Sequence, residues 1–292
     1  MTEHQIHTNE NGFKNYEFLK PFSYIRFGIG SALIIFFLYQ LAGGGIIALL
    51  KARGLQGSLP WAQGVGQIVF MLLPAVWLAG KTPLPVKLML RLERMPTVRE
   101  LLYGLLGVFA IQLFTQGFVT LQELILPQGI ADFYNDLEKQ FEELYRSLLG
   151  SSDLPELMRA LLIGAAIPAV AEEVLFRGLM QRSLEQELSF KKAIILTGLI
   201  FAFVHFNLPV LVPLMLIGMY LGALAYHTES LMLPVAAHFL NNAFSIIGLH
   251  GGESIESLDI SPWLGIVLLT GGAAGTLYCL KKVIANKEKP AV

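Results

Sequence analysis

Charged residues are scarce in this chain of 292 residues: Asp, Glu, Lys and Arg make up 15% of it, whereas 54% of its residues are hydrophobic. An ordinary soluble domain has roughly a quarter charged residues, because water must solvate its surface. The shortage of charge therefore argues against a soluble globule, and it excludes a disordered chain. The solvent that suits this composition is a lipid bilayer.

Other absences narrow the function. The one cysteine, Cys279, cannot form an intramolecular disulfide, and the net charge of -1 offers no field for a nucleic-acid partner. The chain lacks a His-Glu-x-x-His pair and a Gly-x-Ser-x-Gly elbow. Its first 20 residues contain no long apolar run, so we expect no cleavable signal peptide.

Long uncharged runs predict membrane-spanning helices, because about 20 apolar residues cross the hydrocarbon core. The run 193–226 is too long for one crossing, since its 34 residues would extend about 51 Å as a helix. Asn207, Pro209 and Pro213 suit a break there, so we expect two short spans that meet near Asn207. With a span at 154–186, the prediction is an all-α transmembrane bundle of about eight spans. The remaining spans are expected at 27–50, 54–80, 101–122, 230–252 and 260–280.

The distribution of basic residues predicts the orientation of this bundle. With eight spans and the N-terminus inside, sixteen Lys and Arg residues fall on the cytoplasmic side and four on the outer side. This bias satisfies the positive-inside rule, whereas seven spans would place the C-terminal lysines outside. We therefore expect an integral protein of the plasma (inner) membrane with both termini in the cytoplasm. The amphipathic stretch 131–149 suits a helix along the outer interface, and an ordinary polar loop helix is an equally good interpretation.

Charged residues inside a membrane segment are costly and usually mark function. Glu173 and Arg177 lie at i and i+4 and can neutralise each other. Glu172 is rotated about 100° away from Glu173 and lacks that partner. One paired and one free carboxylate are typical of a structural acid beside a working acid. Pro168 is expected to kink the helix just before the pair.

Two later helices add polar groups. Phe201 and His205 share a predicted helix face, as do His238 and Asn242, whereas Asn241 points elsewhere. Each pair alone also fits ordinary helix packing or interhelical hydrogen bonding. Turns near 187–190 and 228–230, however, allow Glu172, His205, His238 and Asn242 to converge in one cavity that opens toward the cytoplasm. We interpreted a third polar group, His227-Thr228-Glu229, as a solvated connection.

This set of side chains suits hydrolysis. Glu172 can act as general base on a water held by His205, while His238 and Asn242 donate to the oxyanion. The same chemistry permits a catalytic zinc bound by Glu172, His205 and His238. The ligand types do not decide between the two mechanisms.

The ordered motifs Glu172-Glu173-x-x-x-Arg177, Phe201-x-x-x-His205 and His238-x-x-x-Asn242 resemble the CAAX protease and bacteriocin-processing (CPBP, or Abi) family of intramembrane endopeptidases. The resemblance covers roughly residues 155–250. It implies that Glu172 is the base, assisted by His205, that His238 and Asn242 form the oxyanion hole, and that Glu173 and Arg177 support them. It favours a metal-independent glutamate mechanism, with zinc as the alternative cofactor. The expected partners are membrane lipid and a membrane-associated peptide or protein substrate.

These observations divide the chain into four regions and leave two other functions open. A non-catalytic binding or scaffold protein would keep the cavity for a lipid or peptide. A proton-coupled transporter would use Glu172 and the histidines as a relay, although no internal repeat supports it. The regions are a cytoplasmic segment 1–25, N-terminal helices 26–150 with the amphipathic helix, catalytic helices 151–250, and a last span with a basic tail 251–292.

Overall fold

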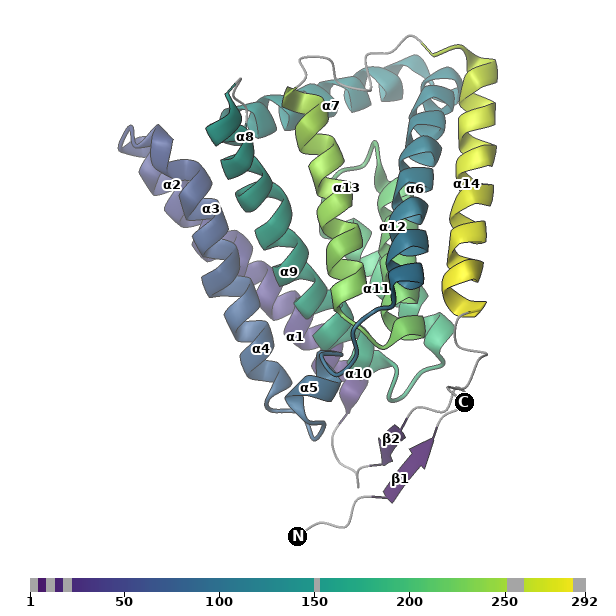
Figure 1. Ribbon diagram of the computed structural model, residues 1–292. Helices are drawn as coiled ribbons and strands as arrows, with labels where there is room; N and C mark the ends of the chain where they lie inside the picture. The colour runs from purple at the N-terminus through teal and green to yellow at the C-terminus, as the bar shows by residue number, and fades with distance from the viewer. Residues whose placement is uncertain (1–4, 9–13, 18–22, 150–152, 251–259, 286–292) are drawn as a thin grey trace.

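The computed structural model describes residues 5–8, 14–17, 23–149, 153–250 and 260–285. Its main body is a bundle of long helices, with α7 crossing one end and α5 at the other (Figure 1). A short antiparallel pair of strands, which the sequence analysis did not predict, precedes the bundle and aligns Gln5 with Glu17. The first half contains β1 (Gln5–Thr8), β2 (Lys14–Glu17), α1 (Tyr24–Leu38), η1 (Tyr39–Gly43), α2 (Gly44–Ala52), η2 (Gln56–Ser58), α3 (Leu59–Gln67), η3 (Ile68–Leu72), α4 (Leu73–Ala79), α5 (Val86–Met89), α6 (Val98–Ile125) and α7 (Gln128–Leu149).

The second half begins with one long segment of alternating α-helical and π-helical parts and continues with four separate helices. The segment comprises α8 (Leu154–Ala160), η4 (Leu161–Ala166), α9 (Ile167–Glu173), η5 (Val174–Gln181) and α10 (Arg182–Leu184). The separate helices are α11 (Phe190–Phe203), α12 (Leu211–Thr228), α13 (Met232–His250) and α14 (Pro262–Ile284).

The expected helical membrane bundle is present. Eight helical segments match the predicted ones, and the predicted break near Asn207 is confirmed, since α11 ends at Phe203 and α12 begins at Leu211. Among the described residues, six segments are long and apolar enough to cross a membrane. The other two are shorter: α11 has 14 residues, and the apolar part of α13 covers Met232–Gly248. The six are Tyr24–Ala52, Gln56–Ala79, Val98–Ile125, Leu154–Leu184, Leu211–Thr228 and Pro262–Ile284.

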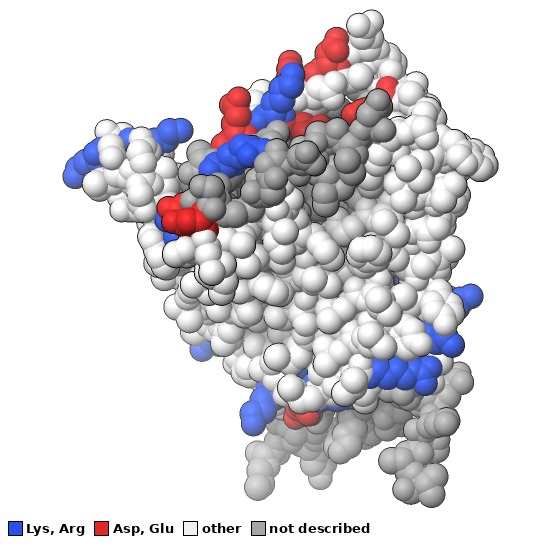
Figure 2. All heavy atoms as spheres, turned by 45° about the horizontal axis from the view of Figure 1, so that its top comes forward, with Lys and Arg blue, Asp and Glu red and all other residues white. Residues whose placement is uncertain are grey.

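The sides of the bundle are apolar. Large hydrophobic side chains such as Ile34, Trp77 and Leu277 are exposed on the long helices. The face in Figure 2 shows a broad uncharged band with charged side chains at its two ends. Exposed apolar surface of this extent is unfavourable in water and favourable against lipid tails.

A buried ion network joins three segments at the end of the bundle near α10. The Arg91 guanidinium pairs with Glu185 and, at 2.8 Å, with Glu229, and Arg182 lies 3.2 Å from Glu229. Burial would lower the pKa of Arg91, but the charges of Glu185 and Glu229 outweigh burial and raise it. The interpretation of Glu229 as part of a solvated connection was therefore wrong. Its partners come from distant parts of the chain, which local sequence does not reveal.

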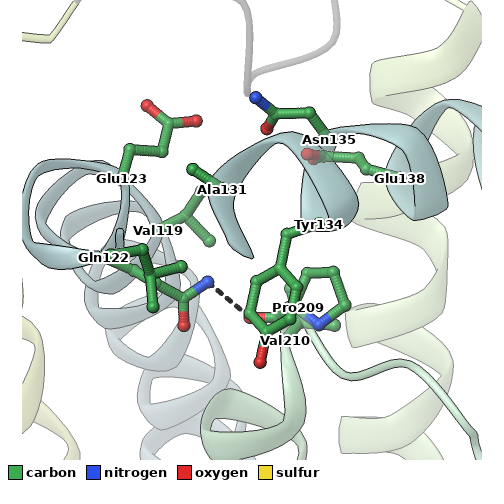
Figure 3. Close-up of a pocket in the computed structure, with 10 residues that line it drawn as sticks. Val119, Gln122, Glu123, Ala131, Tyr134, Asn135, Glu138, Pro209 and Val210 are labelled. Atoms are coloured by element: carbon green, nitrogen blue, oxygen red, sulfur yellow. Dashed lines mark hydrogen bonds between the residues drawn. The ribbon is translucent and has the colours of Figure 1, made fainter. Parts of the chain in front are cut away.

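Helix α6 supports the loop between α11 and α12 from the other end of the bundle. Gln122 Nε2 donates to the Pro209 carbonyl at 3.0 Å. Figure 3 shows this bond beneath Tyr134, which comes from the amphipathic helix α7. The loop that contains His205 is thus tied to a long helix with a capping box at its start, in which Thr97 and Glu100 exchange hydrogen bonds.

Candidate active site

Glu172 and Glu173 lie at the end of α9, a short α-helical segment between two π-helical segments, η4 and η5. Pro168 stands at the start of α9, directly after the π-helical segment η4. Proline has no backbone N–H, so it cannot make the usual helical hydrogen bond to the residue four positions earlier. The loss of this bond allows the wider π-helical turn before it. π-Helical turns occur often at functional sites because they redirect side chains.

Glu173 and Arg177 form the expected ion pair, and both side chains are fully buried. Arg177 Nη1 donates to Glu173 Oε1 at 2.7 Å, and Nη2 donates to the Gly218 carbonyl at 3.0 Å. Helix α12 approaches closely here because Gly218 has no side chain: a Cβ at this position would lie 3.0 Å from Gly198 of α11. The pair thus connects η5 with α12.

Glu173 also contacts His238. The His238 Nδ1 atom lies 2.8 Å from Glu173 Oε1. A carboxylate only accepts hydrogen bonds, so Nδ1 carries the proton of this contact. The other ring nitrogen, Nε2, faces Glu172, and Glu173 therefore fixes both the tautomer and the direction of the His238 ring.

His205 lies in the turn that follows α11 rather than within a helix, which corrects the predicted shared helix face. Its backbone N–H donates to the Ala202 carbonyl, and its Nδ1 lies 2.6 Å from the Phe201 carbonyl. A carbonyl only accepts, so Nδ1 donates and replaces a missing helical bond. The next residue, Phe206, has φ of 52° and ends the helix.

Glu172, His205 and His238, three of the four groups that the sequence predicted to meet, converge. Glu172 Oε2 lies 3.8 Å from His205 Nε2 and 3.9 Å from His238 Nε2. This oxygen is buried and has no hydrogen-bond partner among the described residues. The exposed fractions of the three side chains are 15%, 30% and 4%. The separations exceed direct hydrogen bonds and are suited to a bridging water.

Phe201 holds the cluster together, and the sequence analysis quoted it only as a motif residue. Its ring is buried and lies 4.5 Å from the His205 ring and 5.7 Å from the His238 ring, between centroids. The Arg177 guanidinium lies 4.4 Å from its centroid, at cation–π distance. The i, i+4 spacing to His205 was the available signal, and the contacts with α13 and η5 appear only in three dimensions.

Asn242 lies one helical turn beyond His238 on α13. Its side-chain Oδ1 accepts a 3.4 Å hydrogen bond from Asn241, which in turn accepts one from Gln112 of α6 at 2.9 Å. The part of the chain that the structure describes shows no direct bond between Asn242 and the three converging groups. Asn241 was expected to point away from His238 and Asn242, and the structure shows that it contacts Gln112 of α6.

The alternative zinc ligands lie further apart than ideal tetrahedral ligands do. Tetrahedral ligands at about 2.1 Å from zinc lie roughly 3.4 Å apart, whereas the donor atoms here are 3.8 and 3.9 Å apart. The described residues contain no group of three or more His, Cys, Asp or Glu side chains arranged to hold a metal.

The fold and this cluster define an integral membrane protein with a buried acid–imidazole site. Residues 154–244 match the Rce1-like family, described as type II CAAX prenyl endopeptidase Rce1-like, which confirms the predicted resemblance. The match lies within the predicted catalytic region and implies a membrane protease of the CAAX type that acts on a peptide or protein. No curated protein and no solved structure matches the chain.

Proposed function

We propose that this protein is an intramembrane endopeptidase that hydrolyses a peptide bond with a water activated by Glu172 and His205. The main observation behind this proposal is the buried Glu172 Oε2 atom, which faces the Nε2 atoms of His205 and His238. A buried carboxylate oxygen without a partner is costly, so it is expected to have a function. The family match supports the reaction class.

The first step places water between Glu172 and His205. Because His205 donates from Nδ1, its neutral ring has a lone pair at Nε2 that accepts one hydrogen of the water. Glu172 takes the other hydrogen as a proton while the water oxygen attacks the carbonyl carbon. The π electrons of the carbonyl move to its oxygen, which becomes an oxyanion.

His238 and Asn242 stabilise that oxyanion. Since Nδ1 of His238 already donates to Glu173, a donor at Nε2 requires the imidazolium form. The intermediate then collapses: the C–N bond breaks, and the proton held by Glu172 passes to the leaving amine. The products are a carboxylic acid and an amine, and Glu172 is regenerated.

The surroundings of His205 support an apolar substrate. A cavity of about 340 Å³ lies against the loop that contains this residue. Its walls are mainly aromatic and aliphatic side chains, which include Phe36, Phe37, Phe203, Phe206 and Leu211. An apolar group beside the scissile bond, such as the isoprenyl group of CAAX-type substrates, would be stabilised there. A bacteriocin-type peptide leader is the second candidate substrate.

We further propose that both termini lie in the cytoplasm of a plasma (inner) membrane. The first helix begins and α14 ends at the same end of the bundle (Figure 1). The α14 end contains Lys281 and Lys282, and basic side chains gather on this end in Figure 2. The opposite end, near α7, shows acidic side chains together with basic ones in Figure 2. This asymmetry supports the positive-inside orientation.

The test uses the purified full chain in lipid vesicles and an internally quenched peptide that ends in an isoprenylated Cys followed by three residues. We expect cleavage by the wild type and a loss of at least about 100-fold in kcat for Glu172→Gln, which cannot act as base. Glu156→Gln, the same change at the half-buried start of α8, should retain activity. Absence of cleavage by the wild type would refute the isoprenylated substrate, and full activity in Glu172→Gln would refute the proposed mechanism.

A further inference from the structure

A chain of three amide side chains reaches the candidate site from outside the family-matched segment. Gln112 lies in the middle of α6, and its Nε2 donates to Asn241 Oδ1 at 2.9 Å. Asn241 Nδ2 donates to Asn242 Oδ1 at 3.4 Å. All three side chains are half-buried. The chain therefore connects α6 with the residue that we place in the oxyanion hole.

The direction of this chain determines which group Asn242 has free. An amide has one oxygen that accepts and one NH₂ group that donates. Gln112 occupies the oxygen of Asn241, so Asn241 presents its NH₂ to Asn242. Asn242 accepts with its own oxygen and keeps its NH₂ for another partner. The reversed direction would leave the oxygen of Asn242 free, and its lone pairs would repel an oxyanion.

Helix α6 is well placed to impose this direction. A Cβ at Gly104 would lie 2.7 Å from Leu233 Cδ1, so α6 approaches α13 closely two turns before Gln112. The rings of Phe109 and Phe244 are in contact across the same two helices, with centroids 6.3 Å apart. These contacts, both from residues that precede Gln112 on α6, hold the two backbones close together beside the amide chain. A substitution at position 112 is therefore expected to change the orientations of the amide groups and not the positions of the two helices.

We propose that Gln112 is a positioning residue that sets the direction of the Asn242 amide and so keeps its NH₂ available to the oxyanion. This inference rests on the proposed oxyanion role of Asn242. The competing account is that Gln112 and Asn241 only join two membrane helices, as interhelical hydrogen bonds commonly do. The two accounts differ in what they predict for a carboxylate at position 112.

Gln112→Glu keeps the length of the side chain but removes its donor. An ionised carboxylate accepts the NH₂ of Asn241, which then turns its oxygen toward Asn242 and draws on the NH₂ of that residue. The chain is reversed although its two hydrogen bonds remain. Helix joining alone would survive this change, because a charged acceptor makes a strong hydrogen bond. Gln112→Met removes the chain without reversing it.

The experiment measures kcat and KM for the full chain in lipid vesicles with the isoprenylated quenched peptide. We expect kcat to fall about 10-fold in Gln112→Met and about 100-fold in Gln112→Glu, with KM unchanged, because a lost oxyanion donor costs 10²–10³ at most. Protonation of the introduced carboxyl restores a donor, so the Gln112→Glu rate relative to wild type should rise as pH falls. Gln116→Met is the matched control: Gln116 lies one turn further along α6 and makes no side-chain hydrogen bond among the described residues.

Gln112→Met and Gln112→Glu are also made in the Asn242→Ala background, where the proposal predicts no further loss of kcat. Activity of Gln112→Glu equal to or above that of Gln112→Met would overturn the inference, as would an additional loss in that background. If Asn242→Ala retains the wild-type kcat, the proposed oxyanion role fails. That outcome is distinct from one in which Asn242→Ala loses activity and the Gln112 variants keep it, which refutes only the positioning role. Should Gln112→Met not fold, the pH profile of Gln112→Glu alone decides.

Discussion

Arg177→Met is expected to leave the carboxylate of Glu173 buried without its guanidinium partner. Both side chains have zero exposed area, so water cannot replace the lost charge. Breaking a buried ion pair by removing one partner costs about 3–5 kcal/mol. The bond to the Gly218 carbonyl adds about 1 kcal/mol to this loss.

The double variant Glu173→Gln/Arg177→Met tests the origin of that loss. It removes both charges, and the amide oxygen of the glutamine still accepts from His238 Nδ1. Since replacing both members of a buried pair is often nearly neutral, we expect a loss of about 1–3 kcal/mol, mainly from the Gly218 bond and the cation–π contact with Phe201.

The assay is reversible unfolding in mixed micelles with increasing denaturing detergent, followed by circular dichroism. The double variant should be more stable than Arg177→Met although it contains one more substitution. Equal or lower stability of the double variant would show that the buried carboxylate is not the source of the loss. The argument from buried, uncompensated charge would then be wrong for this site.

Two further predictions concern the cofactor and the orientation. Incubation with 1,10-phenanthroline or EDTA should leave the cleavage rate unchanged, because the proposed mechanism uses Glu172 rather than a metal-bound water, and a rate that falls and returns with added zinc would refute this. In a Cys279→Ala background, a membrane-impermeant maleimide applied to intact cells should label Lys139→Cys on α7 and not Lys282→Cys on α14, and the reverse pattern would contradict the proposed orientation.

The sequence predicted the elements of the site better than their surroundings. Glu173 and Arg177 pair because i, i+4 spacing in a helix places side chains together, which requires no knowledge of other helices. The position of His205 just after a helix end was not predicted, since the backbone conformation of Phe206 depends on the loop that follows. The role of Phe201 between two histidines was also out of reach, because its neighbours Phe176 and His238 come from two other helical segments, η5 and α13.

The ion network of Arg91, Glu185 and Glu229 is another feature that local sequence did not reveal. The sequence indicated only a solvated connection at Glu229, and the structure places its side chain with those of Arg91 and Glu185 in a largely buried network. Charge in a sequence indicates a cost of burial, and partners from distant segments offset part of that cost when the fold brings them together. Composition cannot indicate whether such a meeting occurs.

Apolar run length and helical spacing alone specified a helical membrane bundle, its break near Asn207 and the pairing within the Glu172–Arg177 motif, because these properties depend on neighbours in the chain. Tertiary packing decided how the side chains of the site are oriented toward one another. It turned Nε2 of two histidines toward one carboxylate oxygen, and it placed Gln112 of α6 against Asn241. Hydrogen bonds act over a few ångströms with strict geometry, so only the assembled helices determine which groups can react.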